Sequence, residues 1–409
     1  MRDTRSSLRQ DALGLSEADL GWWRDAKLGL FVHWGLYSIL ERGEWVMFSE
    51  RIPAADYARL ADEFDPQHYD PTTWAAAARA ARMRYVVLTA RHHDGFALWD
   101  SPGSFDGFDA VRHAARRDLL RPFVEAIRQA GLRLGLYYSP MDWRFPGYFR
   151  PQELPDDVRL MKEQTYRQVE ELVSRYGPVD ILWYDGAWLA HQGTDADAAW
   201  LWEPAKLNAM VRAHQPKVVI SPRSGWKGDF VVDEGSHDVT GPIRPEPWEK
   251  CLNLNETAWG YTAEQKLMGR DRALGLFVDT VVRGGNLLLN VGPDRHGVIP
   301  APHVARLEEI GAWIDARADA VFGTRAGPLE PVDGWYGTTQ ADQRVFLFVQ
   351  RWPAEDAPLR IPSLPGHIAR ARVLPAGTVS WSQSDTGILL SVDPQARDPV
   401  TTIVEFTLG

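Results

Sequence analysis

Short apolar runs alternate with amphipathic stretches along about the first 320 residues of the chain. Several runs are continuously apolar, such as the one that begins Tyr85-Val-Val-Leu, which is typical of strands buried on both faces of a parallel sheet. Seven runs predict strands, at residues 28–35, 85–91, 133–140, 180–186, 218–222, 248–255 and 286–292. Helical periodicity predicts helices at residues 74–82, 121–131, 158–177, 205–214, 270–283 and 304–318.

A strand followed by a helix, repeated in this way, indicates successive βα units. Seven or eight such units over about 300 residues favour an α/β fold of the (β/α)8-like barrel type over an open doubly wound sheet. No Gly-x-Gly-x-x-Gly sequence follows the first predicted strand, which weakens the alternative of a dinucleotide-binding sheet.

The pattern changes toward the end of the chain, where short strands separated by turns replace the βα units. Predicted strands at residues 345–352, 359–361, 371–374, 387–392 and 402–408 indicate a small C-terminal antiparallel β-sandwich. We therefore expect two domains, a catalytic barrel at residues 1–325 and the β-sandwich at residues 326–409.

The charge of the chain argues against two classes of partner. The formal net charge is −10 and is spread along the sequence, whereas nucleic acids and anionic membranes attract clustered basic side chains. No run of about 20 apolar residues predicts a membrane-spanning helix, and residues 1–10 are too polar for a secretory signal, so we expect a cytoplasmic protein. The single cysteine, Cys251, excludes an internal disulfide and a CxxC metal site. The sequence leaves open whether the chain forms a homo-oligomer.

Three histidines stand at predicted strand ends, where a barrel carries its active site. The first strand ends at His33 and the second at His92 and His93. Such histidines suit either a metal or a set of sugar hydroxyls, because a neutral imidazole both donates and accepts hydrogen bonds. Adjacent strand residues point to opposite faces, so His92 and His93 reach one ligand only if the chain turns at Asp94-Gly95. We favour hydrogen bonding over a metal.

The aromatic residues of the chain are also compatible with a sugar-binding site. The 18 tryptophans fit a core rich in large rings as well as a sugar site, where an indole stacks on the apolar face of a pyranose. Trp183 and Asp185 lie two apart at the end of the fourth predicted strand and therefore share a face. A ring beside a carboxylate at a barrel mouth suits a nucleophile next to a sugar, and the alternative is that Asp185 caps the following segment.

Several long motifs occur in order along the chain. Residues 22–35 read WWRDAKLGLFVHWG, residues 85–99 contain HHDGF, and residues 284–293 read GGNLLLNVGP. Shorter motifs at 44–45, 137–139, 183–185 and 259–261 fall between them. Over about residues 20–320 this series resembles the α-L-fucosidases of glycoside hydrolase family 29. The resemblance implies a (β/α)8-like barrel followed by a β-sandwich, and it implies no metal or cofactor requirement.

Position by position, the resemblance implies a role for each matching residue. Asp185 matches the catalytic nucleophile, and Trp183 and Arg223 match groups around the sugar ring and the nucleophile. Trp259 matches an aromatic residue that faces the fucose methyl group. The residues that match ligands of the fucose hydroxyls are His33, Glu44, Trp45, His92, His93 and Tyr137.

The acid/base residue varies in position across this family. Residues 229–234 read DFVVDE and match one pattern, Asp-Phe-x-x-x-Glu, which makes Glu234 our candidate. The residues just before Glu234 depart from the usual Thr-Pro, so Glu249 is the main rival and Asp229 the next.

The resemblance therefore implies a retaining exo-α-L-fucosidase acting on fucosylated glycans or oligosaccharides. In such an enzyme Asp185 attacks the anomeric carbon, Glu234 protonates the leaving oxygen, and the two carboxyl groups lie about 5–5.5 Å apart. The alternatives are a related retaining α-L-galactosidase, a transfucosidase, and a sugar-binding protein on an inactive barrel. The last of these predicts the loss of a carboxylate, whereas both are present.

Overall fold

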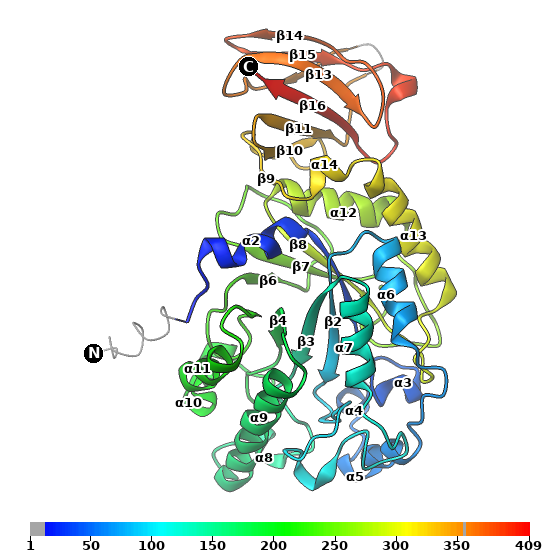
Figure 1. Cartoon of the computed structure of the whole chain (residues 1–409), viewed down its shortest axis with the longest axis vertical. Coiled ribbons are helices and arrows are strands. Elements are labelled where there is room, and N and C mark those ends of the chain that lie inside the picture. The colour runs from blue at the N-terminus through cyan, green and yellow to red at the C-terminus, as the bar shows by residue number, and fades with distance from the viewer. Residues whose placement is uncertain (1–12, 355–356) are drawn as a thin grey trace, which may run out of the picture.

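Eight parallel strands form the central sheet of the protein (Figure 1). The computed structural model describes residues 13–354 and 357–409. The strands follow the order β5-β4-β3-β2-β1-β8-β7-β6, which confirms the predicted barrel-like sheet. No pairing joins β5 to β6 in the described chain, so the barrel is open between them. The strands are β1 Leu28–Val32, β2 Tyr85–Arg91, β3 Arg133–Tyr138, β4 Ile181–Tyr184, β5 Val219–Ile220, β6 Val231–Asp233, β7 Trp248–Asn253 and β8 Asn286–Val291.

The six predicted helices are present and lie outside the sheet (Figure 1). Local signals set their ends: Asp70 caps one of them by accepting a hydrogen bond from the Thr72 amide at 2.9 Å, with Pro71 in the first turn. No described helix is long and apolar enough to cross a membrane. The long helices are α6 Pro71–Ala80, α7 Leu120–Gln129, α9 Pro155–Arg175, α11 Pro204–His214, α12 Arg270–Val282 and α13 Ala301–Asp315.

Short helices occupy the connections, many of them on the side where the parallel strands end. These helices are α3 Tyr37–Leu40, α4 Val46–Ser49, α5 Ala54–Ala58, α8 Pro146–Phe149, α10 Ala199–Trp202 and α14 Ala318–Val321, with 3-10 turns η1 Arg59–Asp62, η2 Phe105–Gly107, η3 Asp195–Ala198 and η4 Pro394–Ala396.

The regular βα alternation breaks at β5 and β6, and each of these two strands is followed by a loop in place of a helix. The loops contain Gly225, Gly228, Gly235 and Gly241, all at positive φ, a conformation that helices do not use. The strand β6, absent from the sequence prediction, has only three residues and none of them is fully buried.

A helix closes the barrel at the end where its parallel strands begin. Helix α2 (Glu17–Ala26) precedes β1, and its Trp23 ring lies 4.7 Å from the Phe230 ring, centroid to centroid. Asn286, at the beginning of β8, donates a hydrogen bond to the Trp23 carbonyl at 2.7 Å. A ligand can therefore approach the barrel interior only from the opposite end, where the strands terminate.

The C-terminal part consists of two antiparallel sheets, as predicted, stacked above the barrel in Figure 1. Alternate residues of one strand face opposite ways: Val345, Leu347 and Val349 pack in the sandwich core, whereas Phe346 and Phe348 join the core of the barrel. The sheets are β13-β16-β11-β10-β9 and β12-β15-β14, with β9 Arg325–Ala326, β10 Tyr336–Ala341, β11 Arg344–Val349, β12 Leu359–Ile361, β13 Ile368–Leu374, β14 Ser380–Ser384, β15 Gly387–Ser391 and β16 Thr402–Leu408.

The contact between α6 and α13 depends on a glycine. A Cβ atom on Gly311 would lie 1.7 Å from the Ala80 carbonyl oxygen. We therefore expect Gly311→Ala to lower the free energy of unfolding by about 1–3 kcal/mol, measured by urea denaturation, because the two helices must separate. Gly275→Ala in α12 is the matched control: nothing lies within 4 Å of its Cβ position, so that variant should be as stable as the wild type or more stable. Equal destabilisation by both would contradict this account.

Candidate active site

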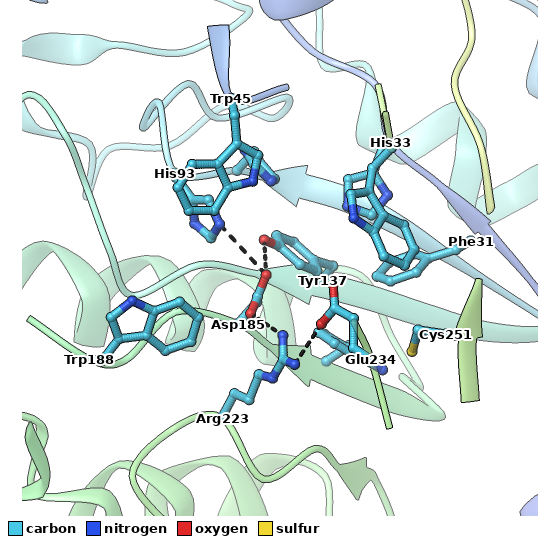
Figure 2. A pocket seen from close by; sticks show the side chains of 13 residues that line it. Phe31, His33, Trp45, His93, Tyr137, Asp185, Trp188, Arg223, Glu234 and Cys251 are labelled. Atoms are coloured by element: carbon cyan, nitrogen blue, oxygen red, sulfur yellow. Dashed lines mark hydrogen bonds and ion pairs between the residues drawn. The ribbon is translucent and has the colours of Figure 1, made fainter. Parts of the chain in front are cut away.

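A pocket lies where the parallel strands end (Figure 2). It has a volume of about 540 Å³, part of which is open to solvent. Every site residue expected from the sequence lines it except Glu44. The lining residues are Phe31, His33, Trp45, His92, His93, Tyr137, Trp183, Asp185, Trp188, Arg223, Glu234, Cys251 and Trp259.

The carboxylate of Asp185 is held from two sides directly after β4. Its Oδ2 accepts a hydrogen bond from the Tyr137 hydroxyl at 2.8 Å, and its Oδ1 lies 2.7 Å from Nη1 of Arg223. The Nε2 atom of His93 is 3.6 Å from Oδ2. These contacts are with pocket side chains rather than with the backbone of the next segment, which argues against the capping alternative.

Arg223 connects the two candidate carboxylates (Figure 2). While Nη1 contacts Asp185, its Nη2 lies 2.5 Å from Oε2 of Glu234. Burial raises the pKa of the Glu234 carboxyl; Arg223 opposes this rise in pKa, and the charge of Asp185 adds to it. The pocket therefore shifts Glu234 toward its protonated form.

The three histidines are buried and form part of the pocket wall. Burial lowers the pKa of His33 to about 4 and holds the pKa of His92 and of His93 well below the ordinary value of 6.5. All three rings are consequently neutral near pH 7, so each has one donor and one acceptor nitrogen. His33 Nδ1 is 2.7 Å from Asn290 Oδ1, and His93 Nδ1 is 2.7 Å from Ser139 Oγ.

The chain turns after β2, as the sequence analysis required for both adjacent histidines to reach the pocket. The Gly95 amide donates to the His92 carbonyl at 3.1 Å, and Gly95 has a φ of +84°. Within residues 13–354 and 357–409, no group of three or more His, Cys, Asp or Glu side chains is arranged to hold a metal ion. That the enzyme needs no metal stays a prediction.

Aromatic rings line the pocket together with the histidines. Tyr137 and Trp183 are nearly parallel, with centroids 5.7 Å apart and an interplanar angle of 14°. The His33 ring lies 4.5 Å from the Phe31 ring and 5.2 Å from the Trp259 ring. The pocket thus offers apolar ring faces next to hydrogen-bonding imidazoles, a combination that suits the amphipathic surface of a sugar.

Glu44 lies behind the pocket wall rather than in it. The side chain is buried, and its Oε2 accepts a hydrogen bond from the Gly260 amide at 2.7 Å. It therefore supports the backbone next to Trp259. Its predicted contact with a sugar hydroxyl is not shown by the described pocket lining.

The two rivals for the acid/base are both engaged elsewhere. Glu249 is buried one layer below the pocket, where its carboxyl oxygens contact the Tyr85 hydroxyl at 2.5 Å and the Trp183 Nε1 at 3.0 Å. Asp229 pairs with Arg212 at 2.7 Å and accepts from the Ile220 amide at 2.8 Å. Neither is among the described residues that line the pocket, whereas Glu234 is.

Three lining residues were not predicted from the sequence: Phe31, Cys251 and Trp188. Phe31 lies two residues before His33, and Cys251 lies two after Glu249, so the two-residue periodicity of a strand could have placed both in the barrel interior. Trp188 follows β4 in a loop, and the sequence there has no periodicity that indicates its direction.

Two carboxylates in a pocket lined by aromatic residues, at the carboxyl-terminal edge of a parallel barrel, are typical of the glycoside hydrolases that use a pair of acids. The sequence model of the alpha-L-fucosidase family matches residues 6–319. The chain belongs to this family, and it is a glycoside hydrolase by that membership.

Individual relatives agree with this assignment. The chain is 28% identical over 366 residues to plasma alpha-L-fucosidase of Rattus norvegicus, covering 81% of this chain and 77% of the relative. Among solved structures it is similar to alpha-L-fucosidase isoenzyme 1 from Paenibacillus thiaminolyticus, with a TM-score of 0.85, 32% identity, and 96% and 99% of the two chains covered. The Thermotoga maritima alpha-fucosidase in complex with fucose gives a TM-score of 0.79 at 26% identity, with 97% and 98% covered.

The buried carboxyl of Glu249 gives a pH-dependent prediction for stability. Burial raises its pKa from an ordinary 4.5 to about 7, so the folded protein keeps this proton at pH values where the unfolded chain has lost it. The protonated Glu249 carboxyl therefore contributes fully to the free energy of unfolding below pH 4.5, and this contribution is lost as the pH rises through about 7. Glu249→Gln resembles the protonated form and cannot ionise.

We compare the free energy of unfolding of Glu249→Gln with that of the wild type at each pH. The difference, variant minus wild type, should increase by about 3 kcal/mol as the pH rises from 4.5 to 7. Urea denaturation at a series of pH values measures it. Parallel curves for the two proteins would show that Glu249 is not held protonated by the fold.

Proposed function

We propose that the protein is a retaining exo-α-L-fucosidase, which releases terminal α-L-fucose from glycans through a covalent fucosyl-enzyme. The observation that carries this proposal is the Arg223 bridge between Asp185 and Glu234. One guanidinium in contact with both carboxylates keeps them close together. A short separation, about 5–5.5 Å, is the arrangement for retention, whereas inverting enzymes separate their carboxyl groups by about 6.5–9.5 Å to admit a water.

In the first step Asp185 attacks the anomeric carbon, and Glu234 gives its proton to the departing oxygen. Tyr137 and Arg223 orient the attacking carboxylate, since each contacts a different oxygen. Once Asp185 becomes an ester its negative charge is gone, and the pKa of Glu234 falls because that charge had helped to raise it. The deprotonated Glu234 then takes a proton from water, which hydrolyses the ester and restores both groups.

The shape of the pocket favours removal of a terminal residue. Below the pocket, Trp183 donates a hydrogen bond to the buried Glu249, and the packed barrel interior follows. A sugar chain therefore cannot extend from the pocket in that direction. The aromatic side of the pocket would receive the apolar C5 methyl group of fucose, and the neutral histidines would share hydrogen bonds with the ring hydroxyls.

The runner-up activities use the same site. A hydroxymethyl group at C5, as in an α-L-galactoside, would place a hydroxyl against the aromatic wall, which weakens its transition state without excluding it. Relative rates on aryl α-L-galactosides and aryl α-L-fucosides separate these two substrates. Product analysis with added sugar acceptors separates a transfucosidase from a hydrolase. The cytoplasmic location and the lack of nucleic-acid and membrane partners stay predictions from composition.

Kinetics of two substitutions test the proposal. Asp185→Asn should lower kcat on an aryl α-L-fucoside by roughly four orders of magnitude, because the amide is not a nucleophile. Glu234→Gln should lower it by about 100- to 10,000-fold for substrates with poor leaving groups, and much less for those whose leaving group needs no proton. In the wild type, kcat/KM should fall as the pH rises through the raised pKa of Glu234, since the acid must be protonated.

Glu249→Gln is the matched control, because it also removes a buried carboxylate but one outside the pocket lining. Its kcat should stay within a few-fold of the wild type at a pH where Glu249 is protonated. Should Glu249→Gln abolish turnover while Glu234→Gln spares it, the two residues exchange roles and the assignment of Glu234 is wrong.

A further inference from the structure

A second hollow lies beside the pocket. It has a volume of about 820 Å³, part of it open to solvent, and is lined by aromatic and apolar side chains, including Phe48, Trp143 and Phe149, with the polar Ser49 and Arg51 also in its wall. We call it the aromatic groove. Phe48 lies on α4, in the connection after β1. Trp143 and Phe149 lie in the connection after β3, Phe149 at the end of α8. The groove therefore opens on the same edge of the barrel as the pocket.

The groove adjoins the pocket, and ring contacts connect the walls of the two. Trp45 lines the pocket, and its ring lies 5.7 Å from that of Phe48 and 5.3 Å from that of Trp143, both of which line the groove. Trp143 is also 5.3 Å from His93, the histidine that approaches Asp185. When the terminal sugar of a molecule occupies the pocket, the rest of that molecule therefore lies within reach of the groove.

Two phenylalanine rings are presented to solvent there in a fixed arrangement. Phe48 and Phe149 are each 38% exposed, and their rings are stacked with an interplanar angle of 7°. His191 packs against Phe48 at 4.3 Å and accepts a hydrogen bond from Trp143 Nε1 at 3.0 Å. The rings are thus held in place before any ligand binds, although their exposure costs hydrophobic free energy.

We propose that the aromatic groove binds a pyranose ring of the glycan to which the fucose is attached. Exposed aromatic faces suit the C–H face of a sugar, and Ser49 and Arg51 offer polar groups to its hydroxyls. The position of the groove beside the pocket, with Trp143 in contact with both Trp45 and His93, selects this occupant over an unrelated ligand. The inference rests on the proposed function and deepens it, since it makes oligosaccharides, rather than small fucosides, the substrates that use the whole site.

The test compares α-L-fucosyl fluoride, whose leaving group has no ring, with a set of α-L-fucosylated di- and trisaccharides. The variant is the double substitution Phe48→Ala/Phe149→Ala. The kcat/KM for the best oligosaccharide, divided by that for the fluoride, should fall about fivefold to tenfold, mostly through a higher KM. Leu389→Ala is the control: this leucine is also 38% exposed but lies on β15 of the sandwich, and its substitution should leave the ratio unchanged.

The outcomes separate the two proposals. A wild type that turns over neither substrate overturns the proposed function. If the wild type is active and the double variant has the same ratio of oligosaccharide to fluoride kcat/KM as Leu389→Ala, the proposal that the groove binds a sugar is wrong. A double variant that changes only the sedimentation coefficient would show that the groove is an interface between copies of the chain, which also overturns its role as a sugar site.

Discussion

The guanidinium of Arg223 is the constraint on which the site depends. Two carboxylates in a buried pocket repel one another, and a cation in contact with both offsets that repulsion. Arg223 lies in the loop from β5 to β6, where the strands of the barrel do not pair. Its contact to Glu234, after β6, therefore crosses the open seam of the sheet, whereas Asp185 follows β4, the strand that pairs with β5. Asp229 anchors the same loop to β5 and to Arg212.

The pocket is a continuation of the barrel interior. Strand side chains alternate, so residues two apart lie in successive layers along the barrel. Phe31 precedes His33, Trp183 precedes Asp185 and Glu249 precedes Cys251, each by two residues, on or directly after one strand. Glu249 lies below the pocket, where it accepts hydrogen bonds from Tyr85 and from Trp183, and Phe31 and Trp183 line the pocket itself. A rigid floor of this kind keeps the reacting carboxylates oriented without help from a ligand.

Much of this arrangement follows from the sequence. Strands buried on both faces leave continuous apolar runs, and β2 begins and ends where its run predicts, at Tyr85 and Arg91. The three-residue β6 left no such signal, and loops with glycines at positive φ, for which the sequence predicted no helix, follow β5 and β6. The strand-end rule located Asp185 and the histidines, and the family pattern favoured Glu234 over Glu249. The fold adds two observations that the sequence could not supply: Glu249 lies at the start of β7, below the pocket, whereas Glu234 follows β6 and contacts Arg223.

Covalent labelling tests the central claim most directly. A 2-deoxy-2-fluoro-α-L-fucosyl fluoride should form the ester quickly and release it slowly, because the fluorine destabilises both transition states and the fluoride leaves without a proton. Mass spectrometry of the digested protein should then find one fluorofucosyl group, on the peptide that contains Asp185. A label on any other residue, or full turnover by an enzyme that never carries the adduct, would contradict a double displacement at Asp185.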